Sequence, residues 1–299
     1  MRLANKHAMI TGAASGIGRA IAMRLASRMT HLTLVDIDAA GLERTAREAR
    51  ELGAAVDSQR RDLTLRDEVD ATVQESLDQS AGVDLLVNNA GVTYHGPTHA
   101  MPAGDLERLM SLNLLAHVRL THGLLPSLLA RPEAHVLNVC SVLGLAGMPR
   151  VSAYCAGKFA MVGFSESLRS EYGRVGLGVT AFCPGFVRTE LFGSAPLPEG
   201  QSKPKSPPAW ICLSPERVAR RAVLAVERNR GRVVLDPYCW WAIGLKRRLP
   251  AAFDWALSLG RRRRVERKRR ELAALAPDPQ TALRMKLGLG ERPRLARAA

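Results

Sequence analysis

Short apolar segments alternate with longer amphipathic segments along most of the chain, and this alternation constrains the fold more than any other feature. The central short segments are apolar on both faces, which is typical of strands covered by helices on both sides of a sheet. Because strands that alternate with helices form βαβ units, the sequence predicts an α/β fold with a doubly wound parallel sheet. The expected strands are His7–Thr11, Leu32–Asp36, Ala55–Arg60, Leu85–Asn88, His135–Ser141, Gly178–Pro184 and Arg232–Leu235.

The longer segments have the spacing of helices that bury one face. The composition agrees with a packed protein, since 46% of the 299 residues are apolar and 24% are charged. These are ordinary values for globular domains, and they exclude a mostly disordered chain and a collagen-like chain. The expected helices are Gly18–Arg28, Ala39–Leu52, Arg66–Gln79, Asp105–Leu129, Ser152–Tyr172 and Pro215–Arg228.

We expect two parts, a globular domain over residues 1–236 and an amphipathic, basic C-terminal extension over residues 237–299. The formal net charge is +15, of which Lys246–Ala299 carries +11, so the remaining chain is nearly balanced at +4. Within the domain, residues 189–214 are rich in proline, glycine and serine. Long loops in compact domains are usually functional or disordered, so this segment is expected to form a lid over a binding site.

The extension combines tryptophans with clusters of basic residues. Trp240, Trp241 and Trp255 occur near the basic clusters Lys246–Arg248 and Arg261–Arg270. This combination suits a helix that lies in a membrane surface beside anionic lipid. Two alternatives stay open, which are docking on a partner subunit and a solvated tail or nonspecific nucleic-acid patch. No specific nucleic-acid binding is expected, because the tail has no zinc-finger or RNA-recognition motif.

The cysteines and the N-terminus bear on the cellular compartment. The five cysteines are odd in number and form no CxxC pair, which favours reduced thiols. The sequence shows no apolar leader region and no stretch of about 18 apolar residues. We therefore expect a cytoplasmic protein, at most peripheral on the inner face of a membrane. The histidine spacing predicts no metal site.

The first expected strand runs into a glycine-rich turn, Thr11–Gly18. Glycine permits positive φ and close approach to a ligand, and the N–H groups at the next helix start form an anion site. These features suit a pyrophosphate, and a plain tight turn is the alternative. Asp36 ends the second expected strand, where a carboxylate can bind a ribose 2′-hydroxyl and repel a 2′-phosphate. We therefore expect NAD in preference to NADP, with a strand-end cap as the alternative role of Asp36.

Five motifs in this order resemble those of the short-chain dehydrogenase/reductase family, in its ordinary dehydrogenase branch. They are TGxxxGIG at Thr11–Gly18, Asp62-Leu63, Asn88–Gly91, the YxxxK pair Tyr154 and Lys158, and Pro184-Gly185. The resemblance covers Lys6 to Leu235. It implies a single Rossmann-like domain with a seven-stranded parallel sheet, NAD(P) at the carboxyl ends of the strands, and assembly into a homodimer or homotetramer.

The resemblance also implies which residues contact the cofactor. The glycine turn would hold the pyrophosphate, Asp36 the adenosine ribose, and the Asp62-Leu63 pair the adenine. The segment after the sixth strand would surround the nicotinamide carboxamide. The expected cofactor-binding residues are Gly12, Ser15, Gly16, Ile17, Gly18, Asp36, Asp62, Leu63, Asn89, Ala90, Gly91, Tyr154, Lys158, Pro184, Gly185, Val187 and Thr189.

Tyr154 and Lys158 are four residues apart, so on a helix they lie on one face. A free tyrosine has a pKa of about 10, and a nearby ammonium would lower that pKa toward the range of a useful base. The resemblance makes this pair catalytic, with Ser141 orienting the substrate oxygen and Asn113 completing a water-mediated proton path. The alternatives are a chance pair on a helix and, for Asn113, a polar residue that bonds a kinked helix backbone. Ser152 is expected to cap the helix of Tyr154.

The expected walls of the substrate site are apolar in Val142–Met148 and at the start of the lid. The expected substrate-binding residues are Ser141, Tyr154, Leu143 and Phe186, with Leu191 and Phe192 in the lid. The sequence thus predicts hydride transfer between nicotinamide and a carbinol or carbonyl carbon of a hydrophobic alcohol or ketone. Lipid-like, steroid-like and retinoid-like compounds fit this class. The alternatives are a non-catalytic cofactor-binding protein on the same fold and nucleic-acid binding through the tail.

Overall fold

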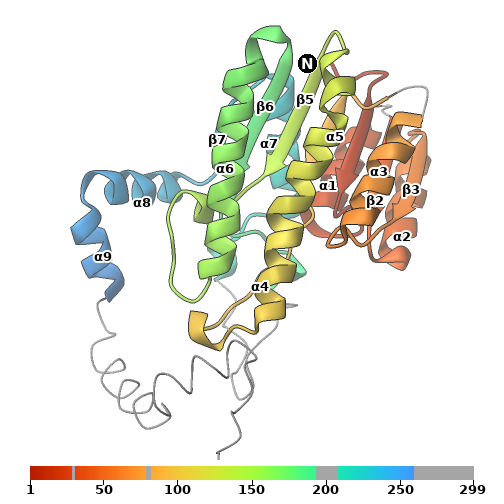
Figure 1. Cartoon of the computed structure of the whole chain (residues 1–299). Coiled ribbons are helices and arrows are strands. Elements are labelled where there is room, and N and C mark those ends of the chain that lie inside the picture. The colour runs from red at the N-terminus through yellow and green to blue at the C-terminus, as the bar shows by residue number, and fades with distance from the viewer. Residues whose placement is uncertain (29–30, 79–81, 193–207, 259–299) are drawn as a thin grey trace, which may run out of the picture. The chain divides into compact units, whose positions relative to one another are not determined.

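The computed structural model describes residues 1–28, 31–78, 82–192 and 208–258 (Figure 1). Its contacts divide the chain into two compact units, Met1–Ile243 and Gly244–Ala299. The predicted boundary after residue 236 coincides with the start of helix α8, inside the first unit. Residues 193–207 of the predicted lid and residues 259–299 of the predicted extension, including its arginine run, lie outside the described residues.

One seven-stranded sheet, parallel throughout, forms the centre of the first unit, and this confirms the predicted fold class. The strand order is β3-β2-β1-β4-β5-β6-β7, so the order changes direction between β1 and β4. Ligands of open α/β sheets bind at such a switch point, at the carboxyl ends of the strands. The strands are β1 (His7–Thr11), β2 (His31–Asp36), β3 (Val56–Arg60), β4 (Leu85–Asn88), β5 (Ala134–Val139), β6 (Leu177–Cys183) and β7 (Arg232–Val234).

Helices cover both faces of this sheet (Figure 1). Ala8 and Ile10 of β1 pack with α1, α2 and α7, whereas Met9 packs with α3, α5 and α6, and all three are fully buried. This two-sided burial is the reason why the strands are apolar at successive positions. The helices are α1 (Gly16–Ala26), α2 (Ala39–Glu51), α3 (Arg66–Asp78), α4 (Ala103–Met110), α5 (His117–Leu129), α6 (Ser152–Tyr172), α7 (Pro215–Glu227), α8 (Pro237–Arg248) and α9 (Pro250–Ser258).

The predicted helix over residues 105–129 contains an interruption that the sequence analysis missed. A π-helical turn, Ser111–Ala116, connects α4 to α5. π-Helical turns inside α-helices occur often at functional sites. The predicted strand over residues 135–141 ends at Val139, so Ser141 lies beyond it and caps the short 3-10 turn Val142–Gly144.

The predicted capping role of Ser152 is wrong. Val151 occupies the cap position of α6, and Ser152 is the first helical residue. The Ser152 hydroxyl instead lies 2.8 Å from the Thr98 hydroxyl. This hydrogen bond attaches the start of α6 to the segment that follows β4. Among the described residues, no helix is both long enough and apolar enough to cross a membrane.

Candidate active site

The candidate active site is built around the glycine turn between β1 and α1. Gly12 and Gly16 have φ values of +67° and +54°, in the region that favours glycine. A Cβ atom on Gly12 would lie 2.8 Å from Ala90 Cα, and a Cβ atom on Gly18 would overlap the Gly12 carbonyl. The turn, the start of α1 and the end of β4 therefore approach too closely to leave room for side chains at these glycines.

Two polar side chains hold the ends of β1 and β4 together at this turn. Asn89 Nδ2 donates hydrogen bonds to the carbonyls of Thr11 at 2.9 Å and Gly12 at 3.1 Å. The Thr11 hydroxyl accepts from the backbone N–H groups of Asn89 at 2.9 Å and Ala90 at 3.0 Å, and it donates to the Val87 carbonyl at 3.3 Å. The side-chain amide of Asn89 is thus engaged in shaping the turn.

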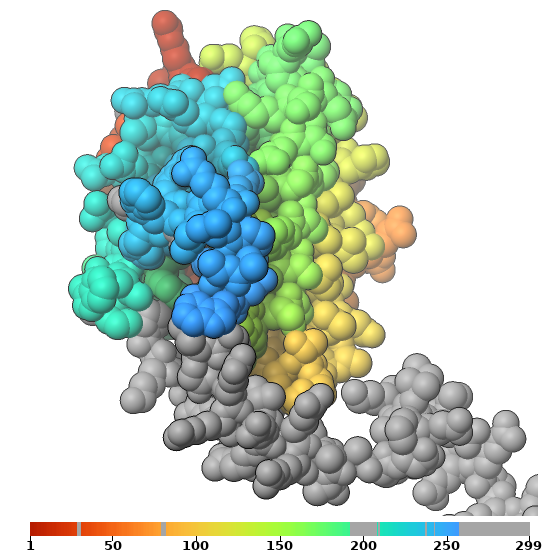
Figure 2. Space-filling view, turned by 90° about the vertical axis from the view of Figure 1, so that its left-hand side faces the viewer, coloured from red at the N-terminus to blue at the C-terminus, as the bar shows by residue number. Residues whose placement is uncertain are grey.

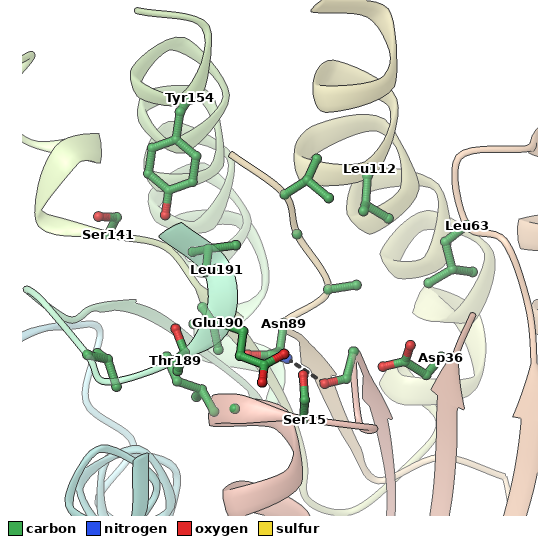
Figure 3. A pocket seen from close by; sticks show the side chains of 18 of the residues that line it. Ser15, Asp36, Leu63, Asn89, Leu112, Ser141, Tyr154, Thr189, Glu190 and Leu191 are labelled. Atoms are coloured by element: carbon green, nitrogen blue, oxygen red, sulfur yellow. Dashed lines mark hydrogen bonds between the residues drawn. The ribbon is translucent and has the colours of Figure 1, made fainter. Parts of the chain in front are cut away.

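A pocket of about 310 Å³ opens beside this turn (Figure 3). The start of α1 at Gly16 supplies helix N–H groups, and Gly12 and Gly16 line the pocket without side chains, an arrangement that fits a pyrophosphate. Most of the predicted site residues line this one pocket. They are Gly12, Ser15, Gly16, Ile17, Asp36, Asp62, Leu63, Asn89, Ala90, Gly91, Ser141, Tyr154, Lys158, Pro184, Gly185, Val187 and Thr189, together with the lid residue Leu191.

Several lining residues were missed by the sequence analysis. They are Ile37, Arg61, Thr64, Val92, Arg108, Leu112, Val139, Cys140 and Glu190. Most of them adjoin a predicted residue in the sequence, so widening each motif by one residue would have found them. Arg108 lies on α4 one helical turn before Leu112, and only the helix geometry brings it to the pocket.

The predicted apolar wall Val142–Met148 does not line the pocket, and four of the predicted catalytic, cofactor-binding and substrate-binding residues are absent from the lining in the described part of the chain. Gly18 lies beneath the turn, against the Gly12 carbonyl and the Asn89 amide. Leu143 is buried in a cluster with Tyr154, and the Phe186 carbonyl accepts a backbone hydrogen bond from Leu213 at 2.9 Å. Neither residue lines the pocket, and their substrate contacts stay predictions. Asn113 is the fourth of these residues.

Both polar atoms of the Asn113 side chain form hydrogen bonds with the backbone of one residue, Val92. Asn113 Oδ1 accepts from the Val92 N–H at 2.8 Å, and its Nδ2 donates to the Val92 carbonyl at 2.8 Å. The side chain is fully buried within the π-helical turn. The alternative, a polar residue that bonds a kinked helix backbone, is met only in part, because Asn113 lies in the π-helical turn but bonds Val92, which is outside any helix. The role of Asn113 in a proton path stays a prediction.

Asp36 and Arg61 form the side of the pocket near β2 and β3. The Asp36 carboxylate accepts hydrogen bonds from the N–H groups of Ala14 at 2.9 Å and Asp38 at 3.0 Å. The Asp36 carboxylate thus caps the end of β2 and also lines the pocket. Arg61 forms ion pairs with Glu75 at 2.8 Å and with Glu68 at 3.6 Å, both on α3.

Tyr154 and Lys158 come from the first two turns of α6, and Ser141 follows β5. Tyr154 and Lys158 are 6% and 4% exposed, so both polar groups are largely shielded from water. Lys158 Nζ lies 5.7 Å from the centre of the Tyr154 ring and donates to the Val139 carbonyl at 2.8 Å. Ser141 Oγ accepts from the Leu143 N–H at 3.1 Å. Figure 3 shows Tyr154 and Ser141 at the same end of the pocket.

Burial is the largest cause of the pKa shifts of Tyr154 and Lys158. It raises the pKa of Tyr154 to about 12, although a hydrogen bond with the Ser141 hydroxyl acts in the opposite direction. Burial also lowers the pKa of Lys158 from its ordinary value. The sequence-based expectation of a lowered pKa for Tyr154 is therefore wrong for the protein by itself. Burial is the largest cause of this rise, and the thiols of Cys140, Cys155 and Cys183 raise the pKa further.

Comparison with known proteins identifies the family. Residues 6–199 match the family described as short chain dehydrogenase. The chain belongs to the short-chain dehydrogenase family. It is 36% identical to SadH of Mycobacterium tuberculosis over 236 residues, which cover 77% of this chain and 86% of SadH. It is 32% identical to human 17-beta-hydroxysteroid dehydrogenase 13 over 251 residues, which cover 83% of this chain and 80% of the human protein.

Solved structures of short-chain dehydrogenases share the fold and bind nicotinamide cofactors. A Burkholderia phymatum enzyme in complex with NAD has a TM-score of 0.74 and 29% identity, over 83% of this chain and 95% of that chain. A Sphingobium yanoikuyae enzyme in complex with NADPH has a TM-score of 0.71 and 29% identity, with the same coverage of 83% and 95%. The expected family, its Rossmann-like fold and its NAD(P)-binding character are thereby confirmed.

The glycine turn generates a stability prediction. Gly18→Ala should lower the free energy of unfolding by about 1–3 kcal/mol, because the new Cβ would overlap the Gly12 carbonyl. The same change should abolish NADH binding by distorting the turn. Urea unfolding and NADH fluorescence titration measure the two effects.

The matched control is Gly163→Ala, in the middle of α6, where a Cβ meets nothing within 4 Å. This control should raise stability by up to about 1 kcal/mol through helix propensity and leave NADH binding unchanged. If the Gly18→Ala variant kept the stability and the NADH affinity of the wild-type protein, this result would contradict the close approach of the turn and the helix.

Proposed function

We propose that the protein is an NAD-dependent dehydrogenase or reductase that acts on a hydrophobic alcohol or ketone. One observation carries the proposal. Tyr154, Lys158 and Ser141 line the same pocket as the glycine turn, so a proton-transferring group and a cofactor cradle share one cavity. Hydride transfer between nicotinamide and a carbinol carbon needs a proton-transferring group and a bound cofactor in the same site.

In this proposal Tyr154 moves the proton. Its pKa of about 12 keeps the hydroxyl protonated at neutral pH, which is the form that donates a proton to a carbonyl oxygen during reduction. Oxidation of an alcohol requires the phenolate instead. A bound nicotinamide supplies the hydride carrier and, when oxidised, a positive charge that favours the phenolate. Ser141 orients the substrate oxygen, and the Lys158 ammonium stabilises the phenolate.

The preference for a hydrophobic substrate is supported by the pocket wall. Val92, Leu112 and Leu191 line it with apolar side chains. The human relative at 32% identity is named as a hydroxysteroid dehydrogenase, which is consistent with an apolar alcohol or ketone. A non-catalytic cofactor-binding role is the alternative. The presence of both Tyr154 and Lys158 in one pocket favours catalysis over that alternative.

Turnover tests the proposal directly. Wild-type protein should reduce or oxidise members of a panel of apolar ketones and alcohols with NAD(H). The Tyr154→Phe variant should lose at least about 100-fold in kcat, because general acid–base catalysis contributes about 10²–10⁴-fold. NADH binding, measured by fluorescence, should persist in the variant because the glycine turn is untouched.

Tyr172→Phe is the matched control, because Tyr172 ends α6 away from the pocket. It should retain wild-type turnover. NADH binding without turnover of any compound by wild-type protein would favour the non-catalytic alternative. Preferential turnover of small polar diols would overturn the hydrophobic substrate class.

The preference for NAD over NADP rests on Asp36. Its carboxylate lines the pocket and is fixed by two backbone N–H groups, from Ala14 and Asp38. A 2′-phosphate placed beside this carboxylate would meet a like charge. Arg61 lies on the same side, and its ion pairs with α3 carboxylates partly neutralise its charge.

Cofactor selectivity should follow the charge at Asp36. Asp36→Asn should improve the ratio of NADPH to NADH affinity by about tenfold or more, which corresponds to about 1.4 kcal/mol. Asp67→Asn, an acidic residue on α3 outside the pocket lining, should leave the ratio unchanged. Equal affinity of wild-type protein for both cofactors would contradict the role of Asp36.

We also propose that α8 contacts an anionic membrane surface. Cys239 and Ile243 of α8 are buried, whereas Trp240 and Trp241 are 59% and 81% exposed. The helix ends in Lys246, Arg247 and Arg248, and Figure 2 shows side chains of this region, in blue, on the surface turned to the viewer. Exposed tryptophans beside basic residues suit a lipid interface. A cytoplasmic location and assembly into a homodimer or homotetramer stay predictions.

Vesicle co-sedimentation tests the membrane proposal. Full-length protein should bind vesicles of phosphatidylcholine with phosphatidylserine, and Trp240→Ser with Trp241→Ser should weaken this binding about tenfold or more by removing interfacial area. Trp210→Ser is the control, since Trp210 is 86% exposed and lies outside α8. Equal sedimentation of all three proteins would end the membrane proposal, and a loss of oligomer mass in the double variant would favour subunit docking.

A further inference from the structure

Asp236 is a buried carboxylate to which the proposed reaction gives no role. It lies between the end of β7 and the first residue of α8, and it is 4% exposed. Its Oδ2 accepts a hydrogen bond from the Gly185 N–H at 3.1 Å. Burying a carboxylate costs free energy that only pairing or hydrogen bonding offsets, so the partner of this group indicates its role.

We propose that Asp236 is a positioning residue, which fixes the wall of the pocket at the end where the nicotinamide ring binds. Asp236 does not line the pocket itself, and it acts through Gly185, which does. The inference rests on the proposed function, because it names a residue that supports the reacting end of the same site.

The register of β6 and β7 brings Gly185 and Asp236 together. Cys183 pairs with Val234 at the last position of this ladder. Gly185 and Asp236 each follow two residues later, so they lie opposite each other beyond the ends of both strands. There a side-chain carboxylate, in place of a strand carbonyl, accepts the Gly185 N–H. The backbone of the pocket wall is thus held past the point where the sheet ends.

The contact between Gly185 and Asp236 leaves no room for a side chain on the glycine. A Cβ atom on Gly185 would lie 2.2 Å from Asp236 Oδ2 and 3.3 Å from Cys239 Sγ, on α8. The first turn of α8 also holds the backbone of Asp236, because the Trp240 N–H donates to the Asp236 carbonyl at 3.2 Å. The carboxylate is therefore fixed between α8 and the pocket wall.

The supported wall adjoins the proton-transferring end of the pocket. Pro184 and Gly185 both line the pocket, and the Pro184 carbonyl accepts from the Val142 N–H at 3.0 Å. Val142 directly follows Ser141, which lines the pocket together with Tyr154. Because the hydride and the proton go to the same carbon–oxygen group, the nicotinamide ring has to bind at this end.

The residues that follow Gly185 are held from a second direction. The Phe186 carbonyl accepts from the Leu213 N–H at 2.9 Å, and the Arg188 N–H donates to the Leu213 carbonyl at 3.0 Å. The bond to Asp236 fixes the residue between this anchor and the one at Pro184. Its loss should therefore let the wall shift at Gly185 while the flanking anchors keep the chain folded.

Removal of the acceptor should weaken binding of the nicotinamide half of the cofactor. The glycine turn and Asp36 serve the adenosine diphosphate half, and Figure 3 shows Asp36 on the opposite side of the pocket from Ser141. In Asp236→Ala the Kd of NADH should rise about tenfold, as expected for the loss of a hydrogen bond to a charged group. ADP-ribose, which lacks nicotinamide, should keep its wild-type Kd. Titration calorimetry with full-length protein measures both.

Asp236→Asn separates the acceptor from the charge. The amide oxygen can accept the Gly185 N–H, so the Kd of NADH should stay within about threefold of wild type. An asparagine variant as weak as Asp236→Ala would overturn the proposal. An equal loss of NADH and ADP-ribose affinity in Asp236→Ala would also overturn it, because a merely structural role predicts that result.

Asp84 supplies the matched control. It is also a buried carboxylate, 7% exposed, and it accepts from a backbone N–H, that of His7, at 3.0 Å. Asp84 precedes β4 and therefore lies at the amino ends of the strands, away from the pocket. Asp84→Ala should lower the midpoint of urea unfolding without changing the ratio of the two Kd values.

The contact itself can be tested without cofactor. Gly185→Ala should lower the urea midpoint, because the new Cβ would overlap the Asp236 carboxylate. In the double variant with Asp236→Ala this overlap is removed, so the two effects should sum to more than the loss measured in the double variant. Additive effects would overturn the proposal.

Gly185→Ala also keeps the binding test available if Asp236→Ala does not fold. It displaces the same wall, so it should weaken NADH binding about tenfold and leave ADP-ribose binding unchanged. Wild-type protein that binds no NADH would contradict the proposed function, and the additivity of the two substitutions would still decide whether Asp236 supports Gly185.

Discussion

The site depends on the contact between the carboxyl ends of β1 and β4, where the strand order of the sheet reverses. Thr11 and Asn89 close this contact with hydrogen bonds to backbone, and Gly12 fits only because it has no side chain. The preceding residue, Asn88, extends the polar contacts in another direction, to Thr121 on α5 and to β5. Two consecutive asparagines at one strand end therefore connect the cofactor cradle to α5 and β5. Asn138 of β5 continues the contacts to Ser165 of α6, the helix that carries Tyr154 and Lys158.

Much of this arrangement could be predicted from the sequence, because its determinants are local. Two-sided apolar strands specify a covered parallel sheet, and the spacing of Tyr154 and Lys158 alone places them on one helix face. Ser141 was expected at the end of the fifth strand, and it follows that strand by two residues. These features depend on the repeat of a helix or strand along the sequence, and not on the packing of side chains that are distant in the sequence.

The features that escaped prediction depend on tertiary contacts. The two-point bond between Asn113 and Val92 joins segments 21 residues apart, and no period in the sequence marks it. Ser152 resembles a helix cap by residue type, but its hydroxyl is taken by Thr98, which lies 54 residues away. The pKa of Tyr154 also escaped prediction, since burial cannot be read from the spacing of a tyrosine and a lysine.

The ionisation of the site follows from how Lys158 is held. A carboxylate beside the ammonium would stabilise it strongly, but it would also cancel the charge that a phenolate needs nearby. Within the described chain, the hydrogen-bond acceptor given to Lys158 is a neutral carbonyl, that of Val139. Neutral acceptors compensate the lost hydration of the ammonium without cancelling its field. Its positive charge then remains available to Tyr154, whose own burial otherwise favours the protonated hydroxyl.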